Sequence, residues 1–109
     1  NKSYIESILL NLLTNSIKYR SEDRTLQITI SAIQINNSVI LTFKDNGIGI
    51  DLERNKDKIF GLYQRFHNYP DSKGLGLYLV KSQVEAMGGT IEIKSEVNKG
   101  TTFTLTFKN

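Results

Sequence analysis

The spacing of apolar and polar residues predicts a helix followed by a β-hairpin in the first half of the chain. Apolar side chains recur every three to five positions across residues 3–19, as on an amphipathic helix. Residues 26–32 alternate between apolar and polar, which indicates a strand with one buried face. An Asn-Asn-Ser turn at residues 36–38 leads into a returning strand at residues 39–43. This hairpin delivers the chain to Asp45.

The second half begins with an irregular segment and then predicts another helix. Short helical turns are expected at residues 51–55 and 57–63, followed by a proline-containing loop at residues 68–73. A helix is predicted over residues 75–87, because Leu, Val and Met recur there at helical spacing. A pair of glycines directly after it is a good helix stop.

A second pair of strands is predicted at the end of the chain. Apolar residues alternate with polar ones at 91–93 and again at 103–107, around a turn at 97–100. The resulting order is helix, two strands, loop, helix, two strands. Mixed helices and hairpins of this kind predict an α+β fold, with a mostly antiparallel sheet and helices on one face.

Composition narrows the range of functions. A chain of 109 residues fits one domain, spanning 1–109, and 39% hydrophobic with 23% charged residues is ordinary for a globular protein. The given sequence shows no apolar run long enough to cross a bilayer, no signal-peptide pattern and no cysteine, so neither membrane contact by this domain nor a thiolate metal site is expected. The net charge of +3 is scattered, which argues against nucleic acid as a partner. The chain lacks an initial Met and starts on a helical pattern, which predicts a piece of a longer protein.

A polar stripe interrupts the first predicted helix. Asn11, Asn15 and Lys18 lie at i, i+4 and i+7 and therefore share one face. Such a stripe can simply be the solvated face. Alternatively, an amide oxygen is a hard neutral ligand that suits Mg²⁺, and Lys18 would supply a point charge for a phosphate.

Two glycine turns provide further candidate chemistry. Asp45 follows an apolar strand, and the glycines at 47 and 49 let the backbone approach a flat ligand. The Asp45 carboxylate could accept from an exocyclic amine, or it could only bond its own turn. Gly74-Leu75-Gly76-Leu77 opens the second helix, where free N–H groups suit phosphate, although glycines also occur there for packing.

Thr101 and His67 are weaker candidates. Thr101 shares the parity of the apolar residues in the last strand, so its hydroxyl is expected to point inward, where it could read a purine edge or serve only as a β-branched strand residue. His67 is the one histidine of the sequence, and no metal cluster or catalytic triad can be built around it.

Five segments, taken together and in order, closely resemble the catalytic ATP-binding domain of two-component sensor histidine kinases. That family belongs to the gyrase/chaperone/histidine kinase/MutL ATPase superfamily. Residues 10–19 resemble its N box, 45–49 its G1 box, 58–65 its F box, 74–77 its G2 box and 100–103 its last glycine motif. The resemblance covers essentially the whole chain.

The resemblance implies a Bergerat ATP-binding fold, a two-layer α/β sandwich with a mixed, mostly antiparallel sheet. ATP and Mg²⁺ would lie between the helices and one sheet face. Asn15 would ligand Mg²⁺, Asp45 would accept from the adenine amino group, and a lid at about 68–73 would cover the phosphates. The implied catalytic residues are Asn11, which would support the phosphate region, Lys18, which would contact phosphate, and Arg65, near the terminal phosphates. The implied nucleotide-binding residues are Asn15, Lys18, Tyr19, Asp45, Gly47, Gly49, Ile50, Lys73, Gly74, Leu75, Gly76, Leu77 and Thr101.

The chain departs from the family pattern at several positions. Ser16 stands where the family often has Ala, Tyr63 where it often has Phe, and Ser72 where it often has Gly. The lid is short, and the family's usual strands ahead of the N box are missing, so an open sheet edge is expected.

The expected activity is phosphoryl transfer to histidine. ATPases of the superfamily resemble one another in carrying a Glu base one helical turn before the metal-binding Asn, where this chain has Asn11. An amide cannot take a proton from water near neutral pH, whereas transfer to an imidazole needs mainly positioning and charge neutralisation. The expected partners are an upstream dimerisation domain carrying the acceptor histidine and a cognate response regulator, in the cytoplasm. The alternatives are a non-catalytic nucleotide-binding regulatory module and a serine kinase of the anti-sigma type.

Overall fold

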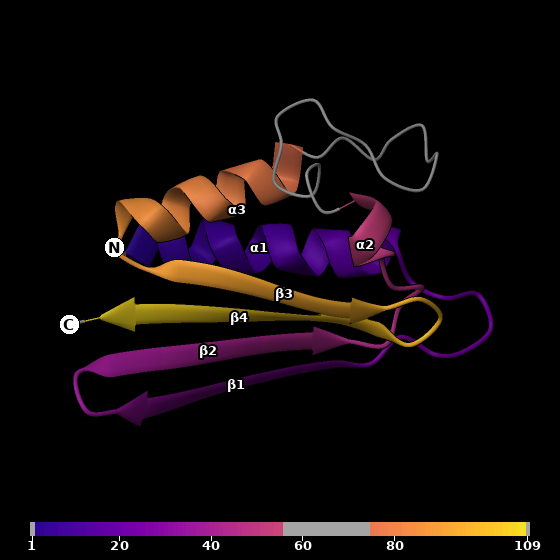
Figure 1. Cartoon of the computed structure of the whole chain (residues 1–109), viewed down its shortest axis with the longest axis horizontal. Coiled ribbons are helices and arrows are strands. Elements are labelled where there is room, and N and C mark those ends of the chain that lie inside the picture. Colours follow the sequence, from indigo (N-terminus) through magenta and orange to yellow (C-terminus); the bar gives the residue numbers. More distant parts are fainter. Residues whose placement is uncertain (1, 56–74, 109) are drawn as a thin grey trace.

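The computed structural model describes residues 2–55 and 75–108, which form a two-layer α+β fold (Figure 1). Two longer helices and one short helix are combined with four strands. Their bounds are α1 Lys2–Lys18, β1 Ile28–Ile35, β2 Ser38–Asp45, α2 Leu52–Asn55, α3 Leu75–Ala86, β3 Thr90–Glu96 and β4 Gly100–Lys108. The predicted fold class is confirmed.

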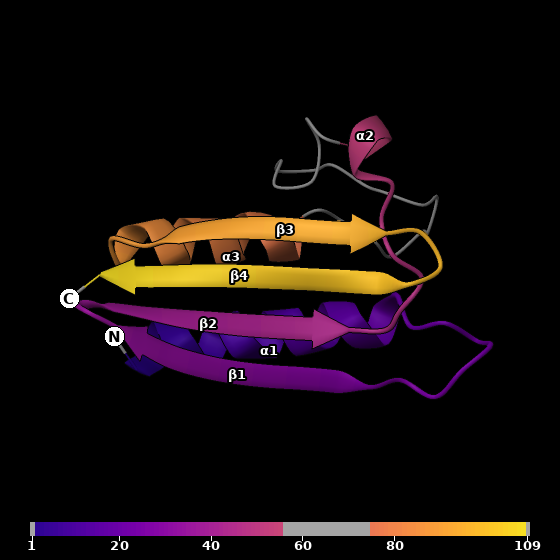
Figure 2. The same ribbon diagram turned by 60° about the horizontal axis from the view of Figure 1, so that its bottom comes forward.

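The four strands form one sheet in the order β1-β2-β4-β3, and each pair of neighbours is antiparallel. Two hairpins, β1-β2 and β3-β4, meet through the β2–β4 pairing in the middle. Helices α1 and α3 lie side by side on one face of this sheet, whereas the opposite face carries no described helix (Figures 1 and 2). None of the helices in the described residues has the length and apolar character needed to span a bilayer.

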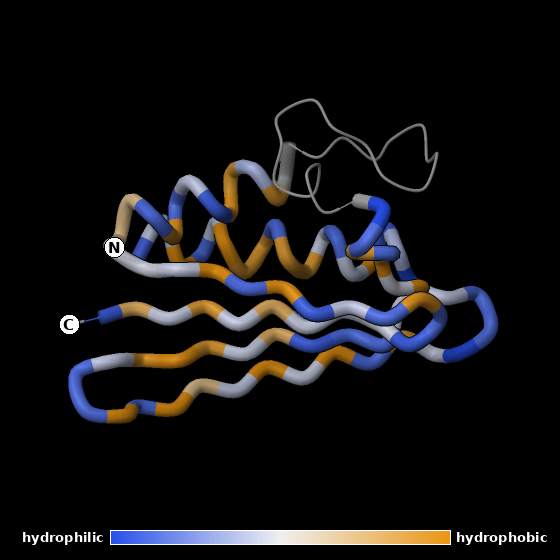
Figure 3. The backbone as a smooth tube through the Cα atoms, viewed as in Figure 1, coloured by the Kyte–Doolittle hydropathy of each residue, from blue (hydrophilic) through white to orange (hydrophobic). Residues whose placement is uncertain are grey.

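The core lies between the helices and the two central strands. Phe43 of β2 is paired with Phe103 of β4, and both aromatic side chains are buried on the helix face. Helix α1 contributes Ile8 and Leu12 to this core. Helix α3 contributes Leu77, Val80 and Val84. Figure 3 shows the alternation of hydrophobic and hydrophilic positions along the strands that separates the two faces.

Strand β1 is an edge strand among the described residues, as the expected open edge requires. Its side chains are mostly exposed, and Ile30, Ile33 and Ile35 each keep about half of their accessible surface. This edge therefore lies outside the core. An unpaired edge with apolar side chains is available for pairing with another strand.

The predicted elements agree with the observed ones, apart from shifts at their ends. The first strand begins at Ile28, because the residues before it bond Asn46 in place of a regular strand partner. The Asn46 side chain accepts from the N–H of Gln27 and donates to the carbonyl of Thr25, and the Asn46 N–H donates to the carbonyl of Gln27. The first hairpin turn is tighter than predicted, because Ile35 already pairs with Ser38. The predicted turns at 57–63 and the loop at 68–73 lie outside the described residues.

The packing of Phe43 generates a prediction about stability. Phe43→Ala removes a fully buried ring from the centre of the sheet, and we expect it to lower the free energy of unfolding by about 3–5 kcal/mol. Ile33→Ala, on the exposed side of β1, is the matched control and should cost about 1 kcal/mol or less. Urea denaturation followed by circular dichroism measures both. Equal losses for the two variants would contradict the assignment of the core.

Candidate functional site

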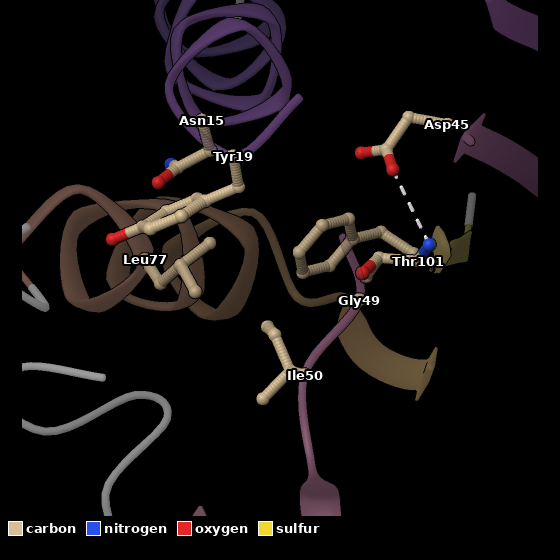
Figure 4. Close-up of a pocket in the computed structure, with 8 residues that line it drawn as sticks. Asn15, Tyr19, Asp45, Gly49, Ile50, Leu77 and Thr101 are labelled. Atoms are coloured by element: carbon tan, nitrogen blue, oxygen red, sulfur yellow. Dashed lines mark hydrogen bonds between the residues drawn. The ribbon is translucent and has the colours of Figure 1, made fainter. Parts of the chain in front are cut away.

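A cavity lies between the helices and the end of the sheet where β2 stops and β4 begins. Its walls come from α1, the segment after β2, α3 and β4, and are mostly apolar (Figure 4). The lining residues are Asn15, Tyr19, Asp45, Gly49, Ile50, Leu77, Thr101 and Phe103.

The polar side of the cavity is created by strand register. Asp45, the last residue of β2, is paired with Thr101 near the start of β4, so both side chains lie on the helix face next to each other. Figure 4 shows them on one side of the cavity, with Asn15, Tyr19 and Leu77 on the other. Asn15 and Tyr19 reach it together because Tyr19 follows directly after α1 and its N–H donates to the carbonyl of Asn15 at 3.0 Å.

Asp45 is buried, and its carboxylate is held by three hydrogen bonds. Its Oδ1 accepts from the backbone N–H of Gly47 at 2.9 Å and of Thr101 at 3.3 Å. Its Oδ2 accepts from the hydroxyl of Ser16 at 2.8 Å. These donors compensate the cost of burying the carboxylate. Because a carboxylate has about four acceptor directions, Oδ2 keeps one for a ligand. The turn interpretation and the ligand interpretation of Asp45 are therefore compatible.

The loop after Asp45 packs backbone against backbone. Ile48 donates to the carbonyl of Tyr19 at 2.8 Å and accepts from the N–H of Asn98 at 2.7 Å. Gly49 has a φ of 76°, and a Cβ there would collide with the backbone of Glu96. Gly49 thus combines a left-handed backbone with a close approach, two conditions that favour glycine. This packing fixes the loop that forms one wall of the cavity.

Arg24 and Asn46 hold the same loop from outside, and the sequence did not indicate either of them. The guanidinium of Arg24 donates to the carbonyls of Asn46 at 2.8 Å, Gly47 at 2.7 Å and Asn98 at 2.8 Å. The side chain of Asn46 accepts from the N–H of Gln27 and donates to the carbonyl of Thr25. These contacts depend on chain segments that only the fold brings together.

The amide of Asn15 is oriented by its own helix. Its Nδ2 donates to the backbone carbonyl of Asn11 at 2.9 Å, and its amide oxygen accepts no hydrogen bond from the described residues. A half-buried amide oxygen at the edge of a cavity fits a hard cation such as Mg²⁺. The described residues contain no cluster of three His, Cys, Asp or Glu side chains that could hold a metal. A cation at Asn15 would therefore take most of its charge partners from the ligand.

The structure brings together seven of the predicted binding residues, whose roles remain predictions. These seven line one cavity: Asn15, Tyr19, Asp45, Gly49, Ile50, Leu77 and Thr101. Gly47 lies beside it and bonds Asp45. Asn11 is half-buried one turn before Asn15, and the exposed Lys18 lines a neighbouring hollow with Ile48 and Asn98.

Other predicted residues fall at or beyond the limits of the described structure. Arg65, Lys73, Gly74 and the histidine at 67 lie outside the described residues, while Leu75 and Gly76 form the start of α3. Two contributors were not predicted as site residues. The sequence places Phe103 in the core, but its side chain also lines the cavity. Ser16 departs from the Ala that is frequent in the family, and its hydroxyl bonds Asp45. That departure was the available signal.

These features define an α+β domain with a ligand cavity enclosed between two helices and an antiparallel sheet. The chain belongs to the family of histidine kinase-, DNA gyrase B- and HSP90-like ATPases, whose model matches residues 1–109.

Three known proteins illustrate the similarity. The heme sensor protein HssS of Staphylococcus saprophyticus is 37% identical over 108 residues, covering 99% of this chain and 23% of HssS. The mycobacterial sensor histidine kinase MprB superposes with a TM-score of 0.81 at 25% identity, covering 99% of this chain and 72% of that one. Full-length ShkA in complex with AMPPNP superposes with a TM-score of 0.77 at 26% identity, covering 95% of this chain and 21% of that one. The chain thus spans about a quarter of the length of HssS.

The close packing at Gly49 generates a second prediction. Gly49→Ala places a methyl group against the Glu96 backbone and imposes a left-handed φ on alanine, so we expect it to destabilise the fold by about 3 kcal/mol. Gly88→Ala is the matched control, because Gly88 has nearly the same φ, 75°, but open space around its Cβ position. That variant should cost only about 1 kcal/mol. Urea denaturation compares the two, and a Gly49 variant no less stable than the Gly88 variant would argue against the close approach.

Proposed function

We propose that this domain binds Mg-ATP in the cavity and transfers the γ-phosphoryl group to a histidine on a separate dimerisation domain, as part of two-component signal transduction. The observation that carries this proposal is the geometry of Asp45. Three donors hold its carboxylate at the cavity, and one acceptor direction of Oδ2 is left for a ligand. An exocyclic amine such as that of adenine is a suitable donor for this position.

The remaining walls suit a flat, partly apolar group. Ile50, Leu77 and Phe103 are buried and line the cavity, so a purine ring would be enclosed by apolar side chains while its amino group reaches Asp45. This arrangement combines an apolar enclosure with a few convergent polar groups, which is typical of small-molecule sites.

The phosphate end would lie toward Asn15. Its amide oxygen would ligand Mg²⁺, which when bound neutralises developing charge on the phosphates. Lys18, Arg65 and Lys73 would supply positive charge, and the N–H groups at the start of α3, near Gly74, would suit phosphate oxygens. Histidine attack on the γ-phosphorus forms the N–P bond as the bond to the β–γ bridging oxygen breaks, leaving ADP.

Transfer is favoured over hydrolysis by the chemistry of Asn11. Asn11 stands one helical turn before Asn15, where a carboxylate would be able to activate water. An amide has no basic site near neutral pH, so water activation would lack an agent there. An imidazole nitrogen is already a good nucleophile and needs mainly to be positioned.

The relatives support this proposal at the level of the family. MprB is a sensor histidine kinase, and the ShkA structure is a complex with AMPPNP. Because the chain spans about a quarter of HssS, the acceptor histidine and the response regulator would be contributed by other domains or proteins. A cytoplasmic location, where ATP is available, belongs to the same proposal.

The first test of the proposal concerns Asp45. We expect the chain to bind Mg-ATP in titration calorimetry and Asp45→Asn to weaken binding at least about tenfold, because an amide cannot satisfy three donors and a ligand amine together. Glu92→Gln, at an exposed position of β3, is the matched control for replacing a carboxylate by an amide and should leave the affinity unchanged. Binding that ignores Asp45→Asn, or no binding at all, would instead support a regulatory module without transfer activity.

The second test concerns the phosphoryl acceptor. We expect this chain alone, incubated with γ-labelled Mg-ATP, to become labelled barely or not at all, because the acceptor histidine would be supplied by a dimerisation domain. Acid-labile, alkali-stable label should accumulate when a histidine-bearing dimerisation domain is added. Stable labelling of the chain by itself on His67 would refute this assignment, and label on a serine would point to an anti-sigma type kinase.

A further inference from the structure

We propose that Ser95 is a positioning residue that turns the hydroxyl of Thr101 into a pure hydrogen-bond acceptor toward the cavity. The polar wall would then select purines with a 6-amino group over those with a 6-oxo group. This inference rests on the proposed nucleotide site and concerns how that site distinguishes its ligands. Ser95 itself is not among the residues that line the cavity.

Ser95 lies at the centre of a hydroxyl network behind the cavity wall. On β3 it is paired in register with Thr101 on β4, so the two side chains stand next to each other. The Oγ of Ser95 contacts the carbonyl oxygen of Gly100 at 2.9 Å, the Oγ1 of Thr101 at 2.8 Å and the backbone nitrogen of Ile50 at 2.8 Å. All three partners are within hydrogen-bond distance.

The direction of each bond follows from counting protons. A serine hydroxyl has one proton to donate and two lone pairs to accept with. The carbonyl of Gly100 can only accept, so the Ser95 proton is directed to it. The N–H of Ile50 can only donate, which uses one lone pair. The remaining lone pair faces Thr101, and therefore the Thr101 hydroxyl donates to Ser95.

The consequence for the cavity is that Thr101 has no proton left to offer a ligand. Thr101 is buried and lines the cavity, so only its lone pairs are available there. Its neighbour Asp45 presents the acceptor direction of Oδ2 that the Ser16 hydroxyl leaves unused. The Thr101 hydroxyl and the Asp45 carboxylate, which form this wall of the cavity (Figure 4), would therefore both act as hydrogen-bond acceptors toward a ligand.

A wall made of hydrogen-bond acceptors distinguishes purines by whether the substituent at position 6 of the ring donates or accepts hydrogen bonds. An amino group has two N–H donors and can satisfy both Asp45 and Thr101. A 6-oxo group would place its own lone pairs against them, which leaves buried polar groups unpaired and costs affinity. If Thr101 could donate, part of this discrimination would be lost.

The test compares Mg-ATP with Mg-ITP, whose base carries a 6-oxo group, by titration calorimetry. The wild type should prefer ATP. Ser95→Ala frees the Thr101 proton to turn toward the cavity, and we expect the ratio of the two dissociation constants to fall by about three- to tenfold. Ser95→Thr keeps the hydroxyl and should retain the preference. Ser95→Cys, whose thiol is a weak donor and acceptor, should reduce the preference for ATP in the same way as Ser95→Ala. It replaces Ser95→Ala in the test if that variant does not fold.

A double-mutant cycle separates positioning from general loosening of the hairpin. In a Thr101→Val background, Ser95→Ala should leave the ATP/ITP ratio unchanged, because the hydroxyl it orients is absent. Thr104→Val, on the same strand but on the opposite face, is the matched control for removing a threonine hydroxyl and should preserve the Ser95→Ala effect.

The outcomes distinguish this inference from the proposed function. A wild type that prefers ATP, with a ratio unmoved by both Ser95→Ala and Ser95→Cys, overturns the role of Ser95 and leaves the nucleotide site standing. A loss of affinity equal for both nucleotides, or additive effects in the cycle, also overturns it by indicating a purely structural role. A wild type that binds neither nucleotide overturns the proposed function and this inference together.

Discussion

The pairing of β2 with β4 is the constraint on which the rest of the structure depends. It joins two hairpins that are far apart in the sequence, aligns Phe43 with Phe103 in the core and places Asp45 beside Thr101 at the end of the sheet. A register shift of one residue would turn each of these side chains to the opposite face. The same interaction therefore determines both the packing of the core and the chemistry of the cavity, so stability and ligand recognition cannot be altered independently at these positions.

The architecture could be predicted from the sequence because its signals are local. Period-two alternation in the strands and helical spacing of Leu and Val persist over many residues, and antiparallel hairpins connect strands that are neighbours in the chain. The ends of elements were harder to predict. Strand β1 starts at Ile28 because the side chain of Asn46, nearly twenty residues later, forms hydrogen bonds with the backbone of Thr25 and Gln27. Nothing in the residues around position 26 signals that contact.

In the candidate site too, some residues could be predicted from the sequence and others only from the structure. The glycine turns and the asparagines were found because motifs occupy consecutive positions, and the structure brings Asn15, Asp45 and Thr101 to one cavity. Arg24 and Ser95 could not be identified from the sequence. Each bonds a residue on another loop or strand, and the spacing of residues along the chain does not indicate such contacts. Motifs thus identify groups that would meet a ligand, while the groups that orient them become visible only when hydrogen bonds can be counted.

The exposed edge at β1 has a practical consequence for work with this domain. Its free backbone groups and the half-exposed Ile30, Ile33 and Ile35 form a surface on which two copies could add strand to strand. Self-association of that kind grows with concentration and with time at elevated temperature. The colloidal behaviour of a purified sample would then be governed by three isoleucines that do not line the cavity, and a single lysine introduced among them would be the natural remedy.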